Sequence, residues 1–228
     1  MTQRKRVVII GGHGKIALLT APKLTDAGYE VHSVIRNPDH HDEVAATGAH
    51  PVMLDIEEAD VEALTGIFDG AAAVVFSAGA GGGNPARTHA VDYEAAVRTM
   101  QAAEQAGVQR YVMVSYITAA VDMGRVDPDS SFYPYAKAKH DADAYLRSTE
   151  LAYTILGPAG LTMEPATGKI LLADEHGQVP GGDLSDEQRV TSRENVAEVI
   201  THVLRTGAGT RSTYNFYDGS TPIAAAIA

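Results

Sequence analysis

The chain contains no cysteine among its 228 residues, which excludes disulfides, thiolate metal sites and cysteine nucleophiles. This absence favours a reducing compartment, and we expect a cytoplasmic protein. No apolar run approaches the roughly 20 residues that a membrane-spanning helix needs, so we expect no membrane partner. The basic start at 1–6 precedes only the short run Val7–Ile10, which is far shorter than the hydrophobic core of a secretion signal.

Basic charge is scarce, and the spacings typical of metal sites are missing. The 18 Lys and Arg residues are outnumbered by 29 Asp and Glu residues, which gives a formal net charge of -11. Such a chain repels a polyphosphate backbone, so we expect no nucleic-acid partner. None of the nine histidines forms an HxxxH or HExxH pair, so the sequence predicts no metal site.

What the chain does have is a glycine-rich turn near its start. The β-branched run Val7–Ile10 predicts a strand, and the apolar spacing over 17–24 predicts a helix that ends near Gly28. Between them, Gly11 can turn the chain sharply, and Gly14 lets the backbone approach a pyrophosphate because it has no Cβ. The free amides of the first helical turn would face that anion. The unit favours dinucleotide binding over an ordinary strand-to-helix turn.

Apolar runs alternate with helical segments along most of the chain, which indicates an α/β fold of one domain spanning 1–228. Because the runs are almost entirely apolar, their strands are expected to be buried on both faces of a doubly wound parallel sheet. Substrate-side loops with short strands are expected over 158–190. The expected strands are Val7–Ile10, Val31–Ile35, Pro51–Leu54, Ala71–Phe76, Tyr111–Val114, Tyr153–Leu156 and a last one at Ser212–Tyr217.

Two helices have recognisable ends. One is expected from Arg87 to Ala106, before Gly107, and should connect the fourth and fifth strands. The other is expected to begin at a capping box over 191–194 and to run through about Leu204.

Ligands of open parallel sheets lie beyond the carboxyl ends of the strands, so the residues after each strand are the first candidates for binding. Arg36 follows the second strand where an acidic residue would bind an NAD ribose, and its guanidinium suits the 2′-phosphate of NADP. NADP is therefore preferred over NAD, although a solvated loop arginine is the alternative. Asp55 and Ile56 after the third strand would contact adenine, and Ala78 and Gly79 after the fourth leave room for ribose and nicotinamide.

Tyr135 and Lys139 lie one helical turn apart, the spacing of a YxxxK motif. A phenol has a pKa near 10, and lowering it by about two to three units requires roughly 3 to 4 kcal/mol. A lysine about 4 Å away supplies roughly that much at an effective dielectric near 20, so Lys139 is expected to lower the pKa of Tyr135. Ser115 ends the preceding strand and can hydrogen-bond a substrate oxygen. Together these three residues form a candidate catalytic set.

Several stretches together resemble the atypical short-chain dehydrogenase/reductase family, specifically its small NmrA-like NAD(P)-binding members that are often labelled sugar epimerases. The matching stretches are GGHGKIA, VIRNP, FSAGAGG, VDYEAAVRTMQAAEQAGVQRYVMVS, YAKAKHDADAYLRSTELAYTIL, TSRENVAEVI and DGSTPI. The resemblance implies a Rossmann-like core over 1–157, a pyridine nucleotide under the glycine turn, and a small C-terminal substrate lobe over 158–228. The residues implied to contact the cofactor are Gly11, His13, Gly14, Lys15, Ile16, Arg36, Asp55 and Ile56.

The resemblance also places residues around the nicotinamide. It implies that Ala78, Gly79, Ser115, Tyr135 and Lys139 flank the ring and that Pro158 and Gly160 line its far side. The chain departs from its relatives at two positions. Gly157 stands where related chains usually have arginine, and Tyr116 stands where they often have a second serine.

These observations lead to the hypothesis of an NADP(H)-binding oxidoreductase that transfers hydride to a small carbonyl or quinone-like substrate. Tyr135 would donate the proton, Lys139 would hold the nicotinamide ribose, and Ser115 would orient the substrate. Two alternatives stay open, a non-catalytic NADPH sensor that signals to a protein partner and an NAD(P)-dependent sugar-nucleotide epimerase. The sequence also leaves open whether the chain forms a homodimer.

Overall fold

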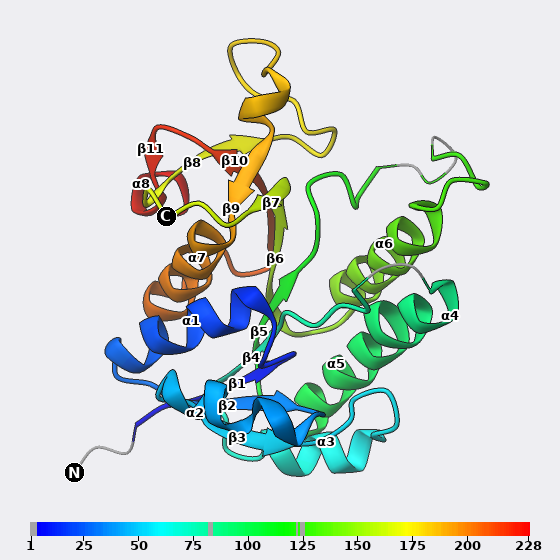
Figure 1. Cartoon of the computed structure of the whole chain (residues 1–228), viewed down its shortest axis with the longest axis vertical. Coiled ribbons are helices and arrows are strands. Elements are labelled where there is room, and N and C mark those ends of the chain that lie inside the picture. The colour runs from blue at the N-terminus through cyan, green and yellow to red at the C-terminus, as the bar shows by residue number, and fades with distance from the viewer. Residues whose placement is uncertain (1–3, 82–83, 122, 124–125) are drawn as a thin grey trace.

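The computed structural model describes residues 4–81, 84–121, 123 and 126–228. Their strands form a nine-stranded sheet in the order β11-β8-β10-β6-β5-β4-β1-β2-β3 (Figure 1). The strands from β3 to β10 in this order are parallel, whereas β8 and β11 run antiparallel to their neighbours. This is a Rossmann-like, doubly wound α/β fold.

The strands of the large sheet are β1 (Arg6–Ile10), β2 (Glu30–Ile35), β3 (His50–Met53), β4 (Ala73–Phe76), β5 (Arg110–Val114), β6 (Ala152–Pro158), β8 (Lys169–Ala173), β10 (Ser212–Asp218) and β11 (Thr221–Pro222). A separate parallel pair consists of β7 (Gly160–Thr162) and β9 (Val190–Ser192). The expected strands are therefore confirmed, with ends that differ by one or two residues.

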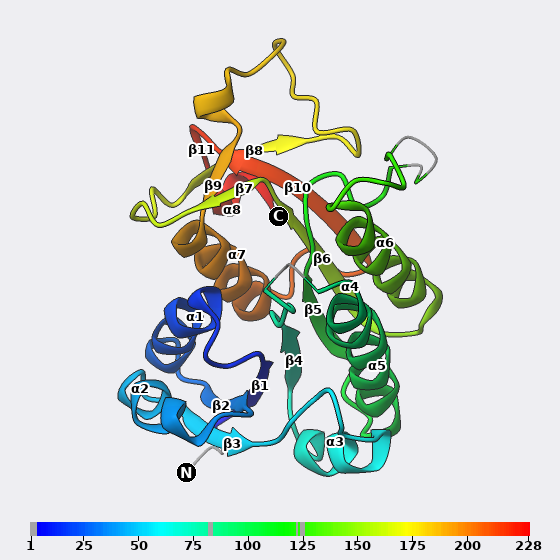
Figure 2. The ribbon, with the colours of Figure 1, turned by 45° about the vertical axis from the view of Figure 1, so that its right-hand side comes forward.

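The helices are α1 (Lys15–Asp26), α2 (His41–Ala46), α3 (Val61–Phe68), α4 (Pro85–Thr88), α5 (Ala96–Gln105), α6 (Tyr133–Ser148), α7 (Arg193–Thr206) and α8 (Ile223–Ala226). Short 3-10 turns lie at Pro38–His40 and Asp186–Gln188. Helices α1 and α7 lie together on one face of the sheet, and α3, α5 and α6 cover the other (Figures 1 and 2).

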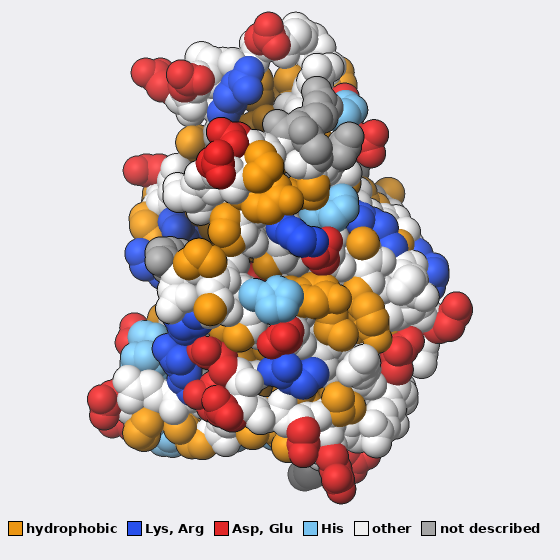
Figure 3. Space-filling view, turned by 90° about the vertical axis from the view of Figure 1, so that its right-hand side faces the viewer, with side chains coloured by type: hydrophobic (Ala, Val, Ile, Leu, Met, Phe, Trp, Pro, Cys, Tyr) orange, Lys and Arg blue, Asp and Glu red, His pale blue; other side chains and the backbone are white. Residues whose placement is uncertain are grey.

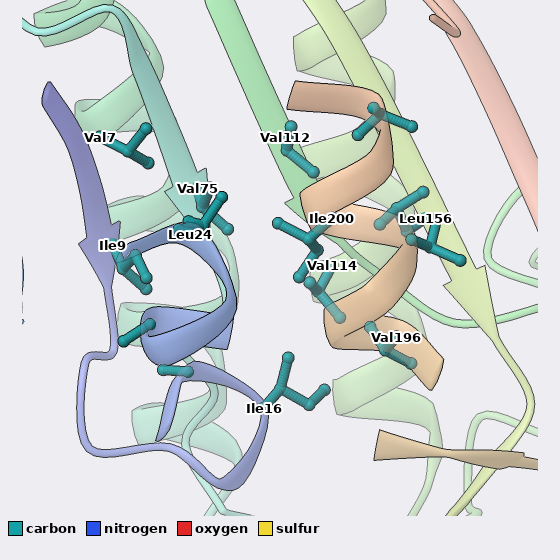
Figure 4. Packing of buried hydrophobic residues seen from close by; sticks show 14 of the residues in the cluster. Val7, Ile9, Ile16, Leu24, Val75, Val112, Val114, Leu156, Val196 and Ile200 are labelled. Atoms are coloured by element: carbon teal, nitrogen blue, oxygen red, sulfur yellow. The ribbon is translucent and has the colours of Figure 1, made fainter. Parts of the chain in front are cut away.

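Alternate residues of each central strand supply two separate hydrophobic clusters, one on each face. On β1, Val7 and Ile9 pack toward α1 and α7, whereas Val8 and Ile10 pack toward α3, α5 and α6. Figure 4 shows the first cluster, in which Leu24 of α1 and Ile200 of α7 lie over the strands. Because both faces are covered, the strands can be apolar along their whole length, as the sequence pattern indicated.

Two predicted helices are present in the structure, but each differs from the prediction in one detail. The expected helix from Arg87 to Ala106 is a continuous helical run, but its middle section at His89–Ala95 is a π-helix between α4 and α5. The capping box expected at 191–194 is wrong, because the N-cap of the helix lies one residue later than predicted. Ser192 is the N-cap of α7 and accepts from the amides of Glu194 and Asn195, because the Thr191 hydroxyl is used inside the core by the Phe216 carbonyl.

The two edges of the large sheet are short and contain proline. β3 has four residues and includes Pro51, and β11 has two residues and ends at Pro222. Most of the segment after β6 lies at one end of the molecule (Figure 2), where β8, β10 and β11 extend the large sheet and β7 and β9 form the small one. Helix α7 of the same segment lies beside α1.

Acidic and basic side chains are interspersed on the face shown in Figure 3, with hydrophobic side chains exposed between them. In the described ranges, no helix combines the length and the apolar character needed to cross a bilayer.

Candidate functional site

The glycine turn after β1 lies against the turn after β4. Gly11 has φ of 82°, and a Cβ on this residue would lie 2.6 Å from the Cα of Ala78. A Cβ on Gly12 would lie 2.6 Å from the Cβ of Ser33 on β2. The Gly12 amide donates to the Val34 carbonyl at 2.8 Å, which ties the turn to β2. Side chains are thus excluded here by backbone conformation and by space.

Helix α1 begins directly after this turn with an uncapped N-terminus. Its N-cap is Gly14, which has no side chain to accept from the first amides, and its first turn contains no acidic residue. Lys15 is exposed, whereas Ile16 is buried in the cluster between α1 and the sheet. The positive end of the helix dipole is therefore available to an anion, and Ile16 can offer such a ligand only its backbone.

A pocket of about 270 Å³ opens over these two turns and the end of β2. Of the residues expected to bind cofactor, it is lined by Gly11, His13, Gly14, Arg36, Ile56, Ala78 and Gly79. The remaining lining residues are Gly12, Val34, Ile35, His40, Leu54, Glu57, Ser77, Arg87 and Val91. The pocket is apolar beside β2 and β3 and charged around Arg36, which suits an adenine ring and a phosphate group respectively.

Five of the expected cofactor residues lie outside this lining. Lys15 and Ile16 begin α1, as described above. The Asp55 carboxylate accepts from the Glu57 amide at 3.0 Å, so it shapes the turn after β3. Pro158 ends β6, where its carbonyl accepts from the Ile117 amide at 3.1 Å, and Gly160 begins β7 with its backbone exposed.

A carboxylate and two guanidinium groups form the charged part of the pocket. Glu57 accepts from Arg36 at 2.7 Å and from the Nε of Arg87 at 3.0 Å, both on the same oxygen. Arg87 also donates to the Ala80 carbonyl. Sequence reasoning missed Glu57 and Arg87. A proline after Asn84 signals the start of a helix there, but no local pattern shows that Arg87 reaches the turn after β3.

Two histidine rings stack at the rim of the pocket. The rings of His13 and His40 lie 3.4 Å apart at 10°, and Nε2 of His13 lies 2.7 Å from the Glu43 carboxylate. Both histidines line the pocket, and His13 was among the residues expected to contact the cofactor.

The three catalytic candidates lie around a buried polar cluster, beyond the pocket lining. The Ser115 hydroxyl donates to the Asp143 carboxylate at 2.6 Å. The Lys139 ammonium donates to the Val114 carbonyl at 2.7 Å and lies 4.0 Å from the Asp92 carboxylate. Only 2% of Lys139 is exposed, so its charge depends on these partners. Asp92 and Asp143 were missed from the sequence, although Asp143 lies four residues after Lys139 on the same helix.

Asp92 connects the cluster to the cofactor pocket. Its Oδ2 accepts from the Ala80 amide at 3.1 Å, and its Oδ1 lies 3.4 Å from the position that a Cβ of Gly79 would take. Asp92 belongs to the π-helical turn, a distortion often found at functional sites. The turn after β4 therefore contacts both the pocket and the cluster.

Burial determines the acidity of this cluster. It raises the pKa of Asp92 and of Asp143, against the opposing effect of the Lys139 charge. The expectation that Lys139 lowers the pKa of Tyr135 is wrong. Burial, followed by the nearby Asp92 carboxylate, raises that pKa. The ammonium of Lys139 donates to the Val114 carbonyl and lies near the Asp92 carboxylate.

Three aromatic rings border the cluster on the side of α6. Tyr116 lies 5.5 Å from Phe132 and 5.5 Å from Tyr135, and Phe132 lies 5.6 Å from Tyr135, between ring centroids. Burial raises the pKa of Tyr116 to about 12. Phe132 is 46% exposed, so this aromatic group reaches the surface.

The glycine at position 157 has a physical explanation. A Cβ on Gly157 would lie 2.2 Å from the Oδ1 of Asn215 and 3.1 Å from the Tyr116 carbonyl. Asn215 is itself held by donation to the Asp174 carbonyl at 3.1 Å. The space that an arginine would need here is therefore filled by β10.

Comparisons with known proteins agree with this geometry. Residues 11–206 match a family described as NAD(P)H-binding. The chain is 30% identical to the uncharacterized sugar epimerase YhfK of Bacillus subtilis, covering 97% of this chain and 98% of that protein. It is also similar to the solved structure of a Bacillus halodurans protein assigned as an NAD-dependent epimerase/dehydratase. The TM-score is 0.84 at 30% identity, over 96% of this chain and 97% of that one. The oxidoreductase ylbE of Lactococcus lactis has a TM-score of 0.80 at 27% identity, over 96% and 93% of the two chains.

The raised pKa of Asp143 predicts a pH-dependent stability. In the unfolded chain this pKa is about 3.9, so above that pH the folded chain keeps a proton that the unfolded chain has lost. The free energy of unfolding then falls as the pH rises toward the folded pKa. Asp143→Asn removes this pH-dependent loss of stability. The free energy of unfolding of the variant, relative to that of the wild type, should therefore rise from about pH 4 toward neutrality. Urea unfolding over a pH series measures this slope.

Asp141→Asn, on the same helix, is the control, and parallel profiles for wild type and Asp143→Asn would contradict the expectation.

Proposed function

Because the chain belongs to the NAD(P)H-binding family, we propose that it is an oxidoreductase that uses NADPH to reduce a small carbonyl or quinone-like substrate. The observation that carries this proposal is the junction at the turn after β4. Gly79 lines the pocket that fits a dinucleotide, and the neighbouring Ala80 amide is bound by Asp92 of the cluster that contains Lys139 and Ser115. A nicotinamide bound at that turn would lie beside proton-transferring side chains.

The residues of the pocket fit the parts of such a cofactor. The diphosphate suits the uncapped N-terminus of α1, where Gly11 and Gly14 keep side chains out of the way. The adenine suits the apolar walls formed by Val34, Leu54 and Ile56. When bound, the nicotinamide supplies the hydride for the reduction.

The proposed proton donor is Tyr135. Its raised pKa keeps the phenol protonated at neutral pH, so it is better suited to give a proton to a developing alkoxide than to take one from an alcohol. This supports the reductive direction. Lys139 is proposed to hold the nicotinamide ribose, and Ser115 to position the substrate. In the structure the Ser115 hydroxyl donates to Asp143, so it would have to turn from this partner to donate to the acceptor oxygen of a carbonyl substrate.

The aromatic group supports a planar substrate. Tyr116 and Phe132 extend from Tyr135 toward the surface, and flat rings stack favourably on such side chains. A quinone-like substrate would be bound by these faces with its oxygen toward Tyr135.

The preference for NADPH over NADH is proposed to depend on Arg36 together with Arg87. Both guanidinium groups contact the single Glu57 carboxylate, so the group has an excess of positive charge that a 2′-phosphate can neutralise. Glu57 holds the two arginines in place and competes with the phosphate for them.

The first prediction from the proposed function concerns the glycine turn. Gly11→Ala should weaken NADPH binding by roughly tenfold or more, about 1.4 kcal/mol, because the new Cβ would push the turn away from Ala78. Gly28→Ala is a matched control, since Gly28 has a similar φ of 90° but nothing within 4 Å of its Cβ position. Calorimetric titration with NADPH should show normal binding for the control. Equal affinities in the two variants would contradict the proposed cradle.

The second prediction concerns cofactor choice. Arg36→Asp and Arg87→Gln should each weaken NADPH binding by roughly tenfold, about 1.4 kcal/mol, and leave NADH binding nearly unchanged. Glu57→Gln should strengthen NADPH binding by removing the competing charge. Parallel titrations with the two dinucleotides test this, because they differ only in the phosphate. A loss of the same size for NADH would show that the arginines serve the structure of the turn and not selectivity.

The third prediction concerns Tyr135. Tyr135→Phe should lower kcat for NADPH oxidation by roughly 100-fold or more and change NADPH affinity little. Tyr133→Phe, at the start of the same helix, should retain turnover. The measurement is a steady-state screen over carbonyls and quinones with the wild type and both variants. Full turnover in Tyr135→Phe would refute its role as the proton donor.

A second candidate function is suggested by the name of the B. subtilis relative, a sugar epimerase. An epimerase would keep its cofactor through purification and exchange epimers of a sugar nucleotide without net redox change. Tight NADPH binding with neither activity would favour a sensor that signals to a protein partner. The same purified protein distinguishes the three outcomes.

A further inference from the structure

We propose that Glu30, His32 and His50 form a binding site for a divalent transition metal ion such as Zn²⁺. The parallel pairing of β2 with β3 places His32 directly opposite His50. Glu30 lies two residues before His32 on the same strand, so its side chain projects from the same face of the sheet. Two imidazoles and a carboxylate therefore meet at one edge of the sheet.

The donor atoms are close enough for one ion. One ligand atom from each of the three residues lies within 4.8 Å of the other two. Oε1 of Glu30 lies 2.7 Å from Nε2 of His32, and the rings of His32 and His50 have centroids 5.3 Å apart. Zn²⁺ binds nitrogen and oxygen at about 2.0–2.2 Å, so tetrahedral ligand atoms lie about 3.3 Å apart. Small side-chain rotations on two rigid strands reach that arrangement.

The ligand chemistry defines the class of ion. Imidazole and carboxylate suit Zn²⁺, Ni²⁺ and Cu²⁺, whereas Mg²⁺ and Ca²⁺ prefer oxygen ligands alone. His50 is exposed, so an ion from solution can reach the site and complete its coordination with water. Arg6 lies opposite Glu30 in the β1 and β2 register, and its positive charge limits the affinity.

The site lies far along the strands from the cofactor pocket. Glu30 and His50 begin β2 and β3, whereas the pocket residues Arg36, Leu54 and Ile56 follow the carboxyl ends of the same strands. A bound ion would join β2 to the edge strand β3 at one end and so stabilise the part of the sheet that supports the pocket. The role is structural, and it does not depend on the proposed oxidoreductase activity.

Sequence spacing could not reveal this site. The two histidines are separated by a turn, a 3-10 segment and α2, and no HxxxH pattern relates them. The prediction that the chain has no metal site considered such local patterns only. The strand register, which is known from the fold, is what brings the ligands together.

The test uses the full chain without a histidine tag, stripped with EDTA and titrated with ZnSO₄ by calorimetry at neutral pH. We expect binding of one ion per chain and a higher Tm with Zn²⁺. His32→Gln and His50→Gln should each weaken binding by roughly tenfold or more. His41→Gln is the matched control, since His41 is an exposed histidine outside the cluster. Unchanged Tm values without metal show that the variants fold.

A second variant separates this site from the other histidine group. His40→Gln changes the stack with His13 in the cofactor pocket and should leave Zn²⁺ binding intact. Loss of binding in His40→Gln, or no binding to the wild type at submillimolar Zn²⁺, would overturn the proposal. Co²⁺ provides a further readout, because tetrahedral coordination by these ligands gives a strong visible absorption that should disappear in His50→Gln.

Discussion

The contact between the turns after β1 and β4 sets the position of the candidate site. Parallel pairing of Ile10 with Phe76 brings the two strand ends level, and the chain then has no room for a side chain between Gly11 and Ala78. On one side of this contact lies the uncapped N-terminus of α1, and on the other lies the amide of Ala80, which binds Asp92. A shift of either turn would therefore disturb the pocket and the polar cluster at the same time.

The polar cluster brings together charges that would be unfavourable if buried separately. Lys139 is enclosed with two carboxylates, and burial raises the pKa of both acids, so protons are retained where negative charge would otherwise accumulate. The buried Ser115 hydroxyl satisfies one oxygen of Asp143.

Most of the fold could be predicted from the sequence, because it depends on patterns local to the chain. The apolar runs gave the parallel strands, and the glycine turn gave the first half of the pocket. Ser192 shows where such reasoning fails by one residue: Thr191 has the same capping chemistry, but its hydroxyl is used by Phe216 in the core. Packing decides between two equivalent neighbours, and a sequence pattern does not contain that information.

The candidate site was only half predictable for a related reason. Recognised spacings indicated the glycines of the turn, Arg36, Tyr135 and Lys139. In the structure, Tyr135 and Lys139 lie with Ser115 around one polar cluster. Glu57, Arg87 and Asp92 act through contacts between segments that are distant in sequence. The direction of the Tyr135 pKa shift was wrong because the pair was considered without the burial of the phenol and without the nearby Asp92 carboxylate. Electrostatics at a buried site depend on all neighbours, and these are known only after folding.

The short, proline-containing edges of the large sheet limit how this molecule can associate. Pro51 in β3 and Pro222 in β11 each lack an amide hydrogen, so neither border offers an uninterrupted row of donors to another strand. Growth of the sheet from one molecule into the next is thereby disfavoured, and the long apolar strands stay shielded from fibre-like stacking. Association of two molecules through β3 or β11 is therefore disfavoured.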